Sequence, residues 1–144
     1  MTQSQYRTLV LVTFALFWSS ALVDFLLPSL LTDELLRAKN SLNQQWTGAS
    51  AVALMLLSLT STMVMTAAMY GLWSFKTWGP RLALFATVLP LIVVMQYGGL
   101  VQSGVAYSIH FASWLTWGAS LLIPFLNPYS TWFKTVQPSP AIAA

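Results

Sequence analysis

Long apolar runs without charged side chains constrain this sequence more than any other feature. The 144 residues include six basic and three acidic side chains. Charged residues are thus 6% of the chain, against about 25% in an average soluble domain. A soluble domain of this size needs a polar surface, which so few charges cannot supply. Disorder requires low hydrophobicity, whereas 57% of these residues are hydrophobic. The composition therefore indicates an integral membrane protein.

Four segments are long and apolar enough for membrane-spanning helices, which need about 20 such residues. They cover residues 7–27, 48–73, 81–98 and 105–126. The sequence therefore predicts an all-α polytopic membrane protein, with one domain of four bundled transmembrane helices over residues 1–144. We expect the first span to be retained, because its apolar run is too long for a cleaved signal peptide.

The longest loop, residues 28–47, is polar and holds most of the acidic side chains. Leu35, Leu36 and Leu42 recur there at helical spacing. This spacing predicts a short helix at the membrane surface, which Thr32 would cap. Residues 127–144 form the C-terminal tail.

The basic residues predict the orientation of the chain. One side of the four-span topology carries Arg7, Lys76, Arg81 and Lys134, and the positive-inside rule places that side in the cytoplasm. Both termini would then be cytoplasmic, and we expect a bacterial inner-membrane protein. The basic residues are scattered, so we expect no nucleic-acid partner.

Two spans carry small or hydroxylated residues every fourth position, a pattern that favours close helix packing in lipid. We expect these two stripes to face neighbouring helices, although each hydroxyl can also bond back to the carbonyl of the preceding turn. The stripes are Ser58, Thr62 and Thr66 in the second span, and Ser108, Ala112, Thr116 and Ser120 in the fourth.

Ionisable groups inside a span are costly and are functional candidates by default. Asp24 and His110 are the two that stand out. At about 1.5 Å per residue, both fall in the outer part of the bundle, at a depth similar to that of Gln96, Tyr97 and Tyr107. One hypothesis is a single polar cluster of these five residues. The alternatives are that Asp24 marks the end of its span at the membrane surface and that His110 is a hydrogen-bonded packing residue.

His110 also suggests a ligand role. Its face of the helix is nearly opposite to the stripe of Ser108 and Thr116. If that stripe packs inside the bundle, His110 points outward, where it would ligate a haem or chlorophyll-type pigment or anchor a partner. An outward His110 conflicts with the polar cluster, and the sequence does not decide between the two.

No enzyme signature is present. The sequence has no H-E-x-x-H, G-x-S-x-G or phosphate-binding loop motif. With one histidine, three acids and no cysteine, the chain cannot build a multi-ligand metal site alone. We expect a protein without catalytic activity.

A basic turn separates the second span from the third. It reads Gly-Leu-Trp-Ser-Phe-Lys-Thr-Trp-Gly-Pro-Arg-Leu-Ala over residues 71–83. This stretch resembles the helix–turn–helix of several small four-helix bacterial membrane families of unknown function. The resemblance covers about a tenth of the chain and implies a topology, not an activity.

The sequence leaves three functions open. The first is a non-catalytic accessory, assembly or scaffolding subunit of a larger membrane complex, with the bilayer and other membrane subunits as partners. The second is a small proton-coupled carrier or channel that uses Asp24 and His110. The third is a tetrapyrrole-binding subunit with His110 as the ligand.

Overall fold

The computed structural model describes residues 1–44, 47–97 and 101–134, with only the backbone of Asn43, Gln96 and Tyr97. Within these ranges the chain forms five α-helices and no strand. They are α1 (Gln3–Leu26), α2 (Asp33–Gln44), α3 (Gly48–Trp73), α4 (Gly79–Tyr97) and α5 (Gly104–Leu122). Three short 3-10 helices, η1 (Pro28–Leu30), η2 (Ile123–Phe125) and η3 (Tyr129–Phe133), complete the structure. The all-helical fold is therefore confirmed.

Two of these helices, α1 and α3, are long and apolar enough to cross a membrane. A shorter apolar helix covers Gly79–Met95 in α4. The predicted helix in the polar loop is also confirmed, because α2 lies there and Thr32 Oγ1 accepts a hydrogen bond from the backbone of Leu35 at 3.4 Å.

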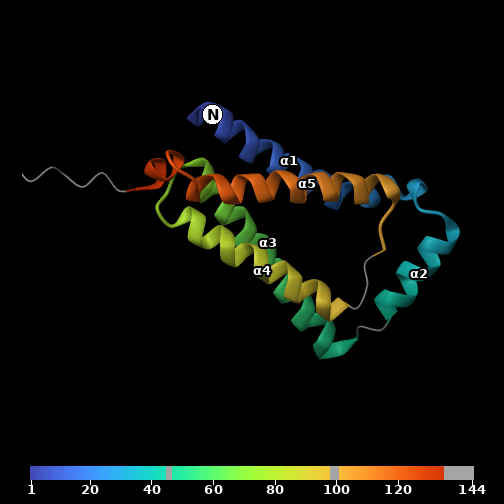
Figure 1. The fold of residues 1–144 in the computed structure, drawn as a ribbon. Helices are drawn as coiled ribbons and strands as arrows, with labels where there is room; N and C mark the ends of the chain where they lie inside the picture. The colour runs from blue at the N-terminus through green and yellow to red at the C-terminus, as the bar shows by residue number, and fades with distance from the viewer. Residues whose placement is uncertain (45–46, 98–100, 135–144) are drawn as a thin grey trace, which may run out of the picture.

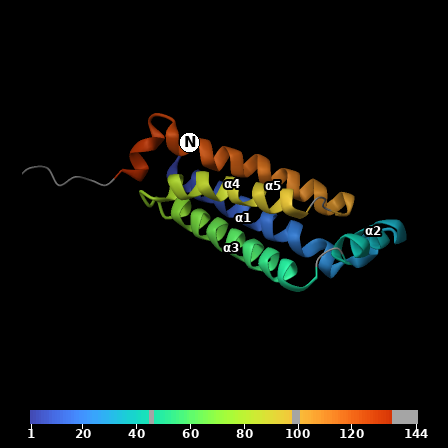
Figure 2. The same cartoon turned by 90° about the horizontal axis from the view of Figure 1, so that it is seen from below.

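The long helices form two antiparallel pairs (Figures 1 and 2). The first and last helices, α1 and α5, pack together, and α3 packs against α4, which follows it in the chain. The two pairs meet at the end of the molecule that holds the N-terminus and the α3–α4 turn, and they separate towards α2. Contacts between α4 and α5 are sparse. The molecule is thus a wedge that is closed at one end and open at the other.

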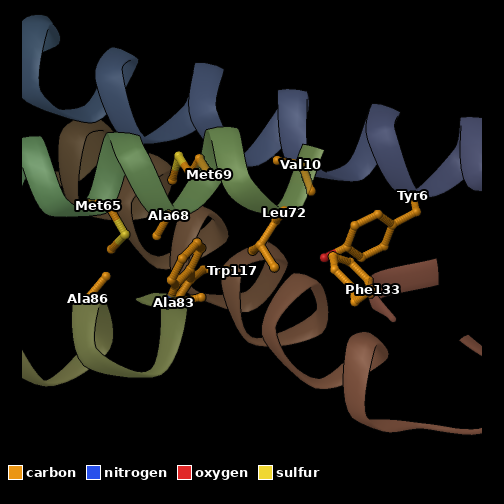
Figure 3. Close-up of a cluster of buried hydrophobic side chains, with 10 residues drawn as sticks. All are labelled: Tyr6, Val10, Met65, Ala68, Met69, Leu72, Ala83, Ala86, Trp117 and Phe133. Carbon is orange, nitrogen blue, oxygen red and sulfur yellow. The ribbon is translucent and has the colours of Figure 1, made fainter. Parts of the chain in front are cut away.

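The hydrophobic core lies where the two pairs meet (Figure 3). Trp117 of α5 lies among small and flexible side chains of α3 and α4, including Met65, Ala68 and Ala83. Small residues let the helices approach, and methionine fills the remaining irregular gaps. The cluster consists of Tyr6, Val10, Met65, Ala68, Met69, Leu72, Ala83, Ala86, Trp117 and Phe133.

Aromatic side chains close this end of the wedge. The Tyr6 ring lies 5.8 Å from that of Phe75 and 5.9 Å from that of Phe133, between ring centroids. The Tyr6 hydroxyl donates a hydrogen bond of 2.8 Å to the carbonyl of Ser120. The first turn of α1 is thereby fixed to the last turn of α5 and to the α3–α4 turn.

The α1–α5 interface follows a seven-residue repeat, the spacing of a helix pair with one continuous seam. On α1 the buried residues are Tyr6, Val10, Thr13 and Ser20. On α5 they are Ala106, Ser113, Trp117 and Ser120.

The structure buries only one end of the predicted packing stripe on α5. Of its four residues only Ser120 is buried, while Ala112 and Thr116 are half-buried and Ser108 is exposed. The Ser108 hydroxyl bonds to the carbonyl of Gly104 within its own helix. Its hydrogen-bonding need is met locally, so it does not require a neighbouring helix.

The stripe on α3 is half-buried and also bonds back along its own helix. The hydroxyls of Ser58, Thr62 and Thr66 each donate to the carbonyl four residues earlier, at 2.8–2.9 Å. The fully buried face of α3 is instead an adjacent one. It comprises Leu54, Ser61, Met65, Ala68, Met69, Gly71 and Leu72.

The turn between α3 and α4 depends on two glycines. The backbone N–H of Lys76 donates to the carbonyl of Gly71 at 2.8 Å, and that of Phe75 donates to Leu72 at 3.2 Å. This pattern is a Schellman motif, in which the residue after the cap takes a left-handed conformation. Phe75 does so with φ of 53°, and its ring packs in the aromatic cluster. The turn brings the backbones of Gly71 and Gly79 into direct contact, with no room for a side chain on either.

We predict that Gly79→Ala destabilises the protein by about 1–3 kcal/mol, the usual cost of overpacking a close contact. A Cβ at this position would lie 2.6 Å from the carbonyl carbon of Gly71. Gly118→Ala is the control, because nothing lies within 4 Å of the added carbon and alanine favours a helix. Thermal unfolding in detergent measures both; equal melting temperatures would contradict the close contact.

Candidate functional site

Asp24 lies in the last turn of α1 and is half-buried. Both of its carboxylate oxygens accept hydrogen bonds from Ser103. Oδ2 accepts from the Ser103 backbone N–H at 2.9 Å, and Oδ1 accepts from the Ser103 hydroxyl. The carboxylate is thus held by a single residue that is 79 positions away in the chain.

Ser103 is also the N-cap of α5. Its side chain is almost fully buried, and its Oγ accepts the backbone N–H of Ala106 at 3.1 Å. The hydroxyl therefore accepts from the first turn of α5 and donates to Asp24. A carboxylate is stabilised at a helix N-terminus by the free N–H groups and the helix dipole. This arrangement links the end of α1 to the start of α5 and gives Asp24 a structural role.

His110 lies two turns further along α5 and is half-buried. Its Nε2 accepts the indole N–H of Trp114 at 2.8 Å. Because that nitrogen is the acceptor, we expect the proton of the neutral ring on Nδ1. No hydrogen bond to Nδ1 is formed by the part of the chain that the structure describes.

A groove of about 490 Å³ lies between α4 and α5 where the two helix pairs separate. Its walls are largely apolar, and its polar side chains are Gln102, Tyr107 and His110. Oε1 of Gln102 is buried, with no hydrogen-bond partner among the described residues. The groove thus offers hydrogen-bonding groups at Tyr107 and His110. The lining residues are Pro90, Leu91, Val94, Gln102, Gly104, Tyr107, His110 and Trp114.

The predicted polar cluster divides between two places. Tyr107 and His110 line the groove, whereas Asp24 bonds to Ser103. No hydrogen bond among the described residues joins Asp24 to His110. The side chains of Gln96 and Tyr97 lie outside the described residues.

His110 lies beside the buried face of α5, not opposite to it. Trp117 and Ser113, which share its side of the helix, are both buried. The expectation of an outward His110 assumed that the Ser108 stripe faces the bundle, and Ser108 is exposed. Among residues 1–44, 47–97 and 101–134, no three histidine or acidic side chains gather as metal ligands.

Sequence reasoning missed Ser103, Gln102 and the role of Trp114. A serine before a glycine and an apolar run is a recognisable N-cap signal, so Ser103 could have been found. The four-residue spacing of His110 and Trp114 also permits a contact on one helix face. The pairing of Asp24 with Ser103 has no local signal, because it depends on how α1 and α5 meet.

The four residues used to predict topology lie at the closed end of the wedge and near it. Arg7 is held there by aromatic rings, with its guanidinium carbon 5.4 Å from the Trp73 ring centroid and 5.1 Å from that of Phe75. Its Nε also donates to the carbonyl of Trp73 at 3.3 Å. Lys76 lies in the exposed α3–α4 turn, and Arg81 and Lys134 line a pocket beside it.

Comparison of the chain with known protein families, curated proteins and solved structures gives no match.

We predict that Asp24 and Ser103 stabilise the fold as a pair. Ser103→Ala removes the N-cap hydroxyl and its bond to the carboxylate, so it should cost about 1–2 kcal/mol of unfolding free energy. In a double-mutant cycle with Asp24→Asn, we expect the two effects to be non-additive.

The control for this pair is Ser108→Ala, an exposed serine on the same helix whose hydroxyl, among the described residues, bonds to the carbonyl of Gly104. It should leave the midpoint of unfolding nearly unchanged. Strictly additive effects of the Asp24 and Ser103 substitutions would show that the two side chains do not interact.

We predict that His110 carries its proton on Nδ1. It is the only histidine in the sequence, so ¹⁵N-histidine labelling gives the NMR signals of one imidazole. Trp114→Phe should shift the Nε2 resonance because the ring loses its donor. The control is Trp117→Phe, whose indole donates to Thr87 at 3.0 Å and not to His110. A protonated Nε2 in the unmodified protein would refute the assignment.

Proposed function

We propose that this chain is a four-span integral membrane protein with both termini in the cytoplasm of a bacterium. It acts without catalysis as an accessory subunit of a larger membrane complex. The length of α4 and α5, 19 residues each, suits a bilayer core of about 30 Å at 1.5 Å per residue. Their pairing with the two apolar helices α3 and α1 supports a shared direction through the membrane.

The serine and threonine side chains of α5 are compatible with a bilayer because they are satisfied internally. The hydroxyls of Ser108, Ser113, Thr116 and Ser120 all donate to carbonyls of the preceding turn, at 2.7–3.1 Å. Lipid offers no hydrogen bonds, so such internal pairing is what a spanning helix requires. These internal hydrogen bonds explain how the serine-rich helix α5 could cross a bilayer beside the more apolar helices α1 and α3.

The groove between α4 and α5 is the observation that carries the accessory role. A chain that functions alone in lipid can close its helices around its own core, but here two neighbouring helices separate and leave about 490 Å³. An added helix, about 10 Å across, would place apolar side chains against Leu91 and Val94. One polar side chain on it would meet Tyr107 or His110, as interhelical hydrogen bonds do in membranes. We therefore propose that a helix of a partner subunit binds in this groove.

The contacts give less support to the other two functions. A proton carrier needs an exchangeable carboxylate, whereas both oxygens of Asp24 are engaged by Ser103. A pigment ligand needs a ring nitrogen with a free lone pair, whereas the lone pair of His110 Nε2 accepts the indole N–H of Trp114 and Nδ1 carries the proton of the neutral ring.

The absence of cysteine allows a clean test of both parts of this proposal with single-cysteine variants. In intact spheroplasts, Ser41→Cys on the exposed part of α2 should react with an impermeant maleimide. Thr77→Cys in the α3–α4 turn should react only after permeabilisation. The reverse pattern, or equal labelling of both positions, would overturn the topology.

The partner is tested with a photo-crosslinker attached at Tyr107→Cys, which is 63% exposed in the groove. We expect one discrete adduct with a different membrane protein that also co-purifies in mild detergent. The same crosslinker at Met55→Cys, which is 70% exposed on α3, should yield no protein adduct.

A groove-filling substitution makes this test specific. Val94→Trp fills the groove and should abolish both the adduct and co-purification, whereas Ile92→Trp, on the other side of α4 at the same depth, should retain them. Only lipid adducts, an adduct with a second copy of this chain, or equal effects of the two tryptophans would contradict the accessory role.

A further inference from the structure

The closed end of the wedge has a surplus of positive charge with no acid to balance it. The three acidic side chains of the sequence are Asp24, Asp33 and Glu34, and all lie near the open end, in α1's last turn and in α2. Arg7, Lys76, Arg81 and Lys134 lie towards the other end. An unpaired cation attracts an anion from outside the chain most strongly where it is partly shielded from water.

Two of these cations share a pocket. Arg81, in the first turns of α4, and Lys134, directly after η3, line a concavity of about 350 Å³. Thr77, Trp78 and Phe133 complete its lining. Arg7 differs because aromatic rings and a carbonyl already hold it. The pocket thus combines two positive charges with a hydroxyl donor and an indole.

An apolar strip continues from this pocket along α4. Leu84, Phe85 and Val88 follow Arg81 at three, four and seven residues, and so lie on the same side of the helix. They are 48%, 56% and 53% exposed. Trp78, at 42% exposed, lines the pocket one turn before Arg81, on the side away from the strip, and tryptophan is favoured at membrane surfaces.

We propose that this pocket binds the phosphate headgroup of an anionic phospholipid whose acyl chains lie along α4. Arg81 offers paired N–H donors that match phosphate oxygens, and Lys134 adds a second charge. An acidic peptide would be attracted by the same charges, but it has no long apolar chain that would cover the exposed strip on α4. The proposal rests on the membrane placement proposed above and is independent of the partner in the α4–α5 groove.

The test is lipid retention by the purified protein, measured by native mass spectrometry after exchange into neutral detergent with dioleoyl-phosphatidylglycerol or dioleoyl-phosphatidylcholine. We expect phosphatidylglycerol to be retained and phosphatidylcholine to be lost. The double variant Arg81→Gln/Lys134→Gln should bind phosphatidylglycerol roughly twenty-five-fold more weakly, because each basic side chain near an anionic surface strengthens binding about fivefold.

The charge-matched control is Arg37→Gln/Lys39→Gln on α2, which removes two positive charges from the opposite end of the molecule. It should bind phosphatidylglycerol as the unmodified protein does. Equal loss in both double variants, or no loss in the Arg81/Lys134 variant, would overturn the site. So would equal retention of the two lipids.

A second measurement uses the unmodified protein and does not depend on whether a variant folds. Phosphatidylglycerol with a photoactivatable acyl chain should label peptides that contain residues 77–88; labelling confined to other regions would refute the proposal. Competition with inorganic phosphate distinguishes lipid from free anion. Displacement of the lipid by millimolar phosphate would mean that the pocket binds a free anion, and it would overturn the lipid assignment.

The two proposals can fail separately. Loss of lipid binding in the Arg81/Lys134 variant should leave the Tyr107 adduct and the cysteine labelling pattern unchanged. A failed partner experiment, in turn, would leave the lipid measurement interpretable, since the pocket and the groove lie on different parts of α4.

Discussion

The contact between α1 and α5 is the interaction on which the rest of the structure depends. It brings together the first and last helices of the chain and is fixed near both ends by polar bonds. Tyr6 donates to the Ser120 carbonyl at one end, and Asp24 accepts from Ser103 at the other. Between these bonds the seam consists largely of small or hydroxylated side chains. Such residues let two backbones approach closely. In lipid, where hydrophobic burial does not drive helices together, this close packing is a main source of helix association.

The α3–α4 pair is joined to this seam at one end only. Large side chains, above all Trp117 and Leu72, fill the space where the two pairs meet. Beyond them, contacts between α4 and α5 become sparse, and the pairs separate. The groove therefore results from where the bulky residues lie along the helices. Its polar groups on α5, Tyr107 and His110, lie on the open side of Trp117.

The sequence predicted the helices well because their signals are local. The third predicted segment, residues 81–98, corresponds to α4 at Gly79–Tyr97, and the polar loop contains a short helix, α2, as expected. The helix faces were harder to predict. Serine and threonine suggested a packing surface on α5, but Ser108 bonds to its own backbone and is exposed, whereas Trp117 is buried.

The candidate site was predictable only in part. Asp24 and His110 stood out because ionisable groups are rare in apolar segments, and both do make specific polar contacts. Their partners differ from those expected, because a partner depends on which helices meet. His110 has its partner one turn along the same helix, whereas the partner of Asp24 is set by the antiparallel pairing of α1 with α5.

The pairing of Asp24 with Ser103 has a consequence for how the protein is made. A ribosome releases α1 first and α5 last of the long helices, so the carboxylate is synthesised 79 residues ahead of the serine that will hold it. During that interval α3 and α4 can already form their hairpin, because their contact is local. The hydrogen bonds of Asp24 in α1 thus form only after α5, the last long helix, has been synthesised. A chain truncated before Ser103 would leave Asp24 without either of its hydrogen bonds to that residue.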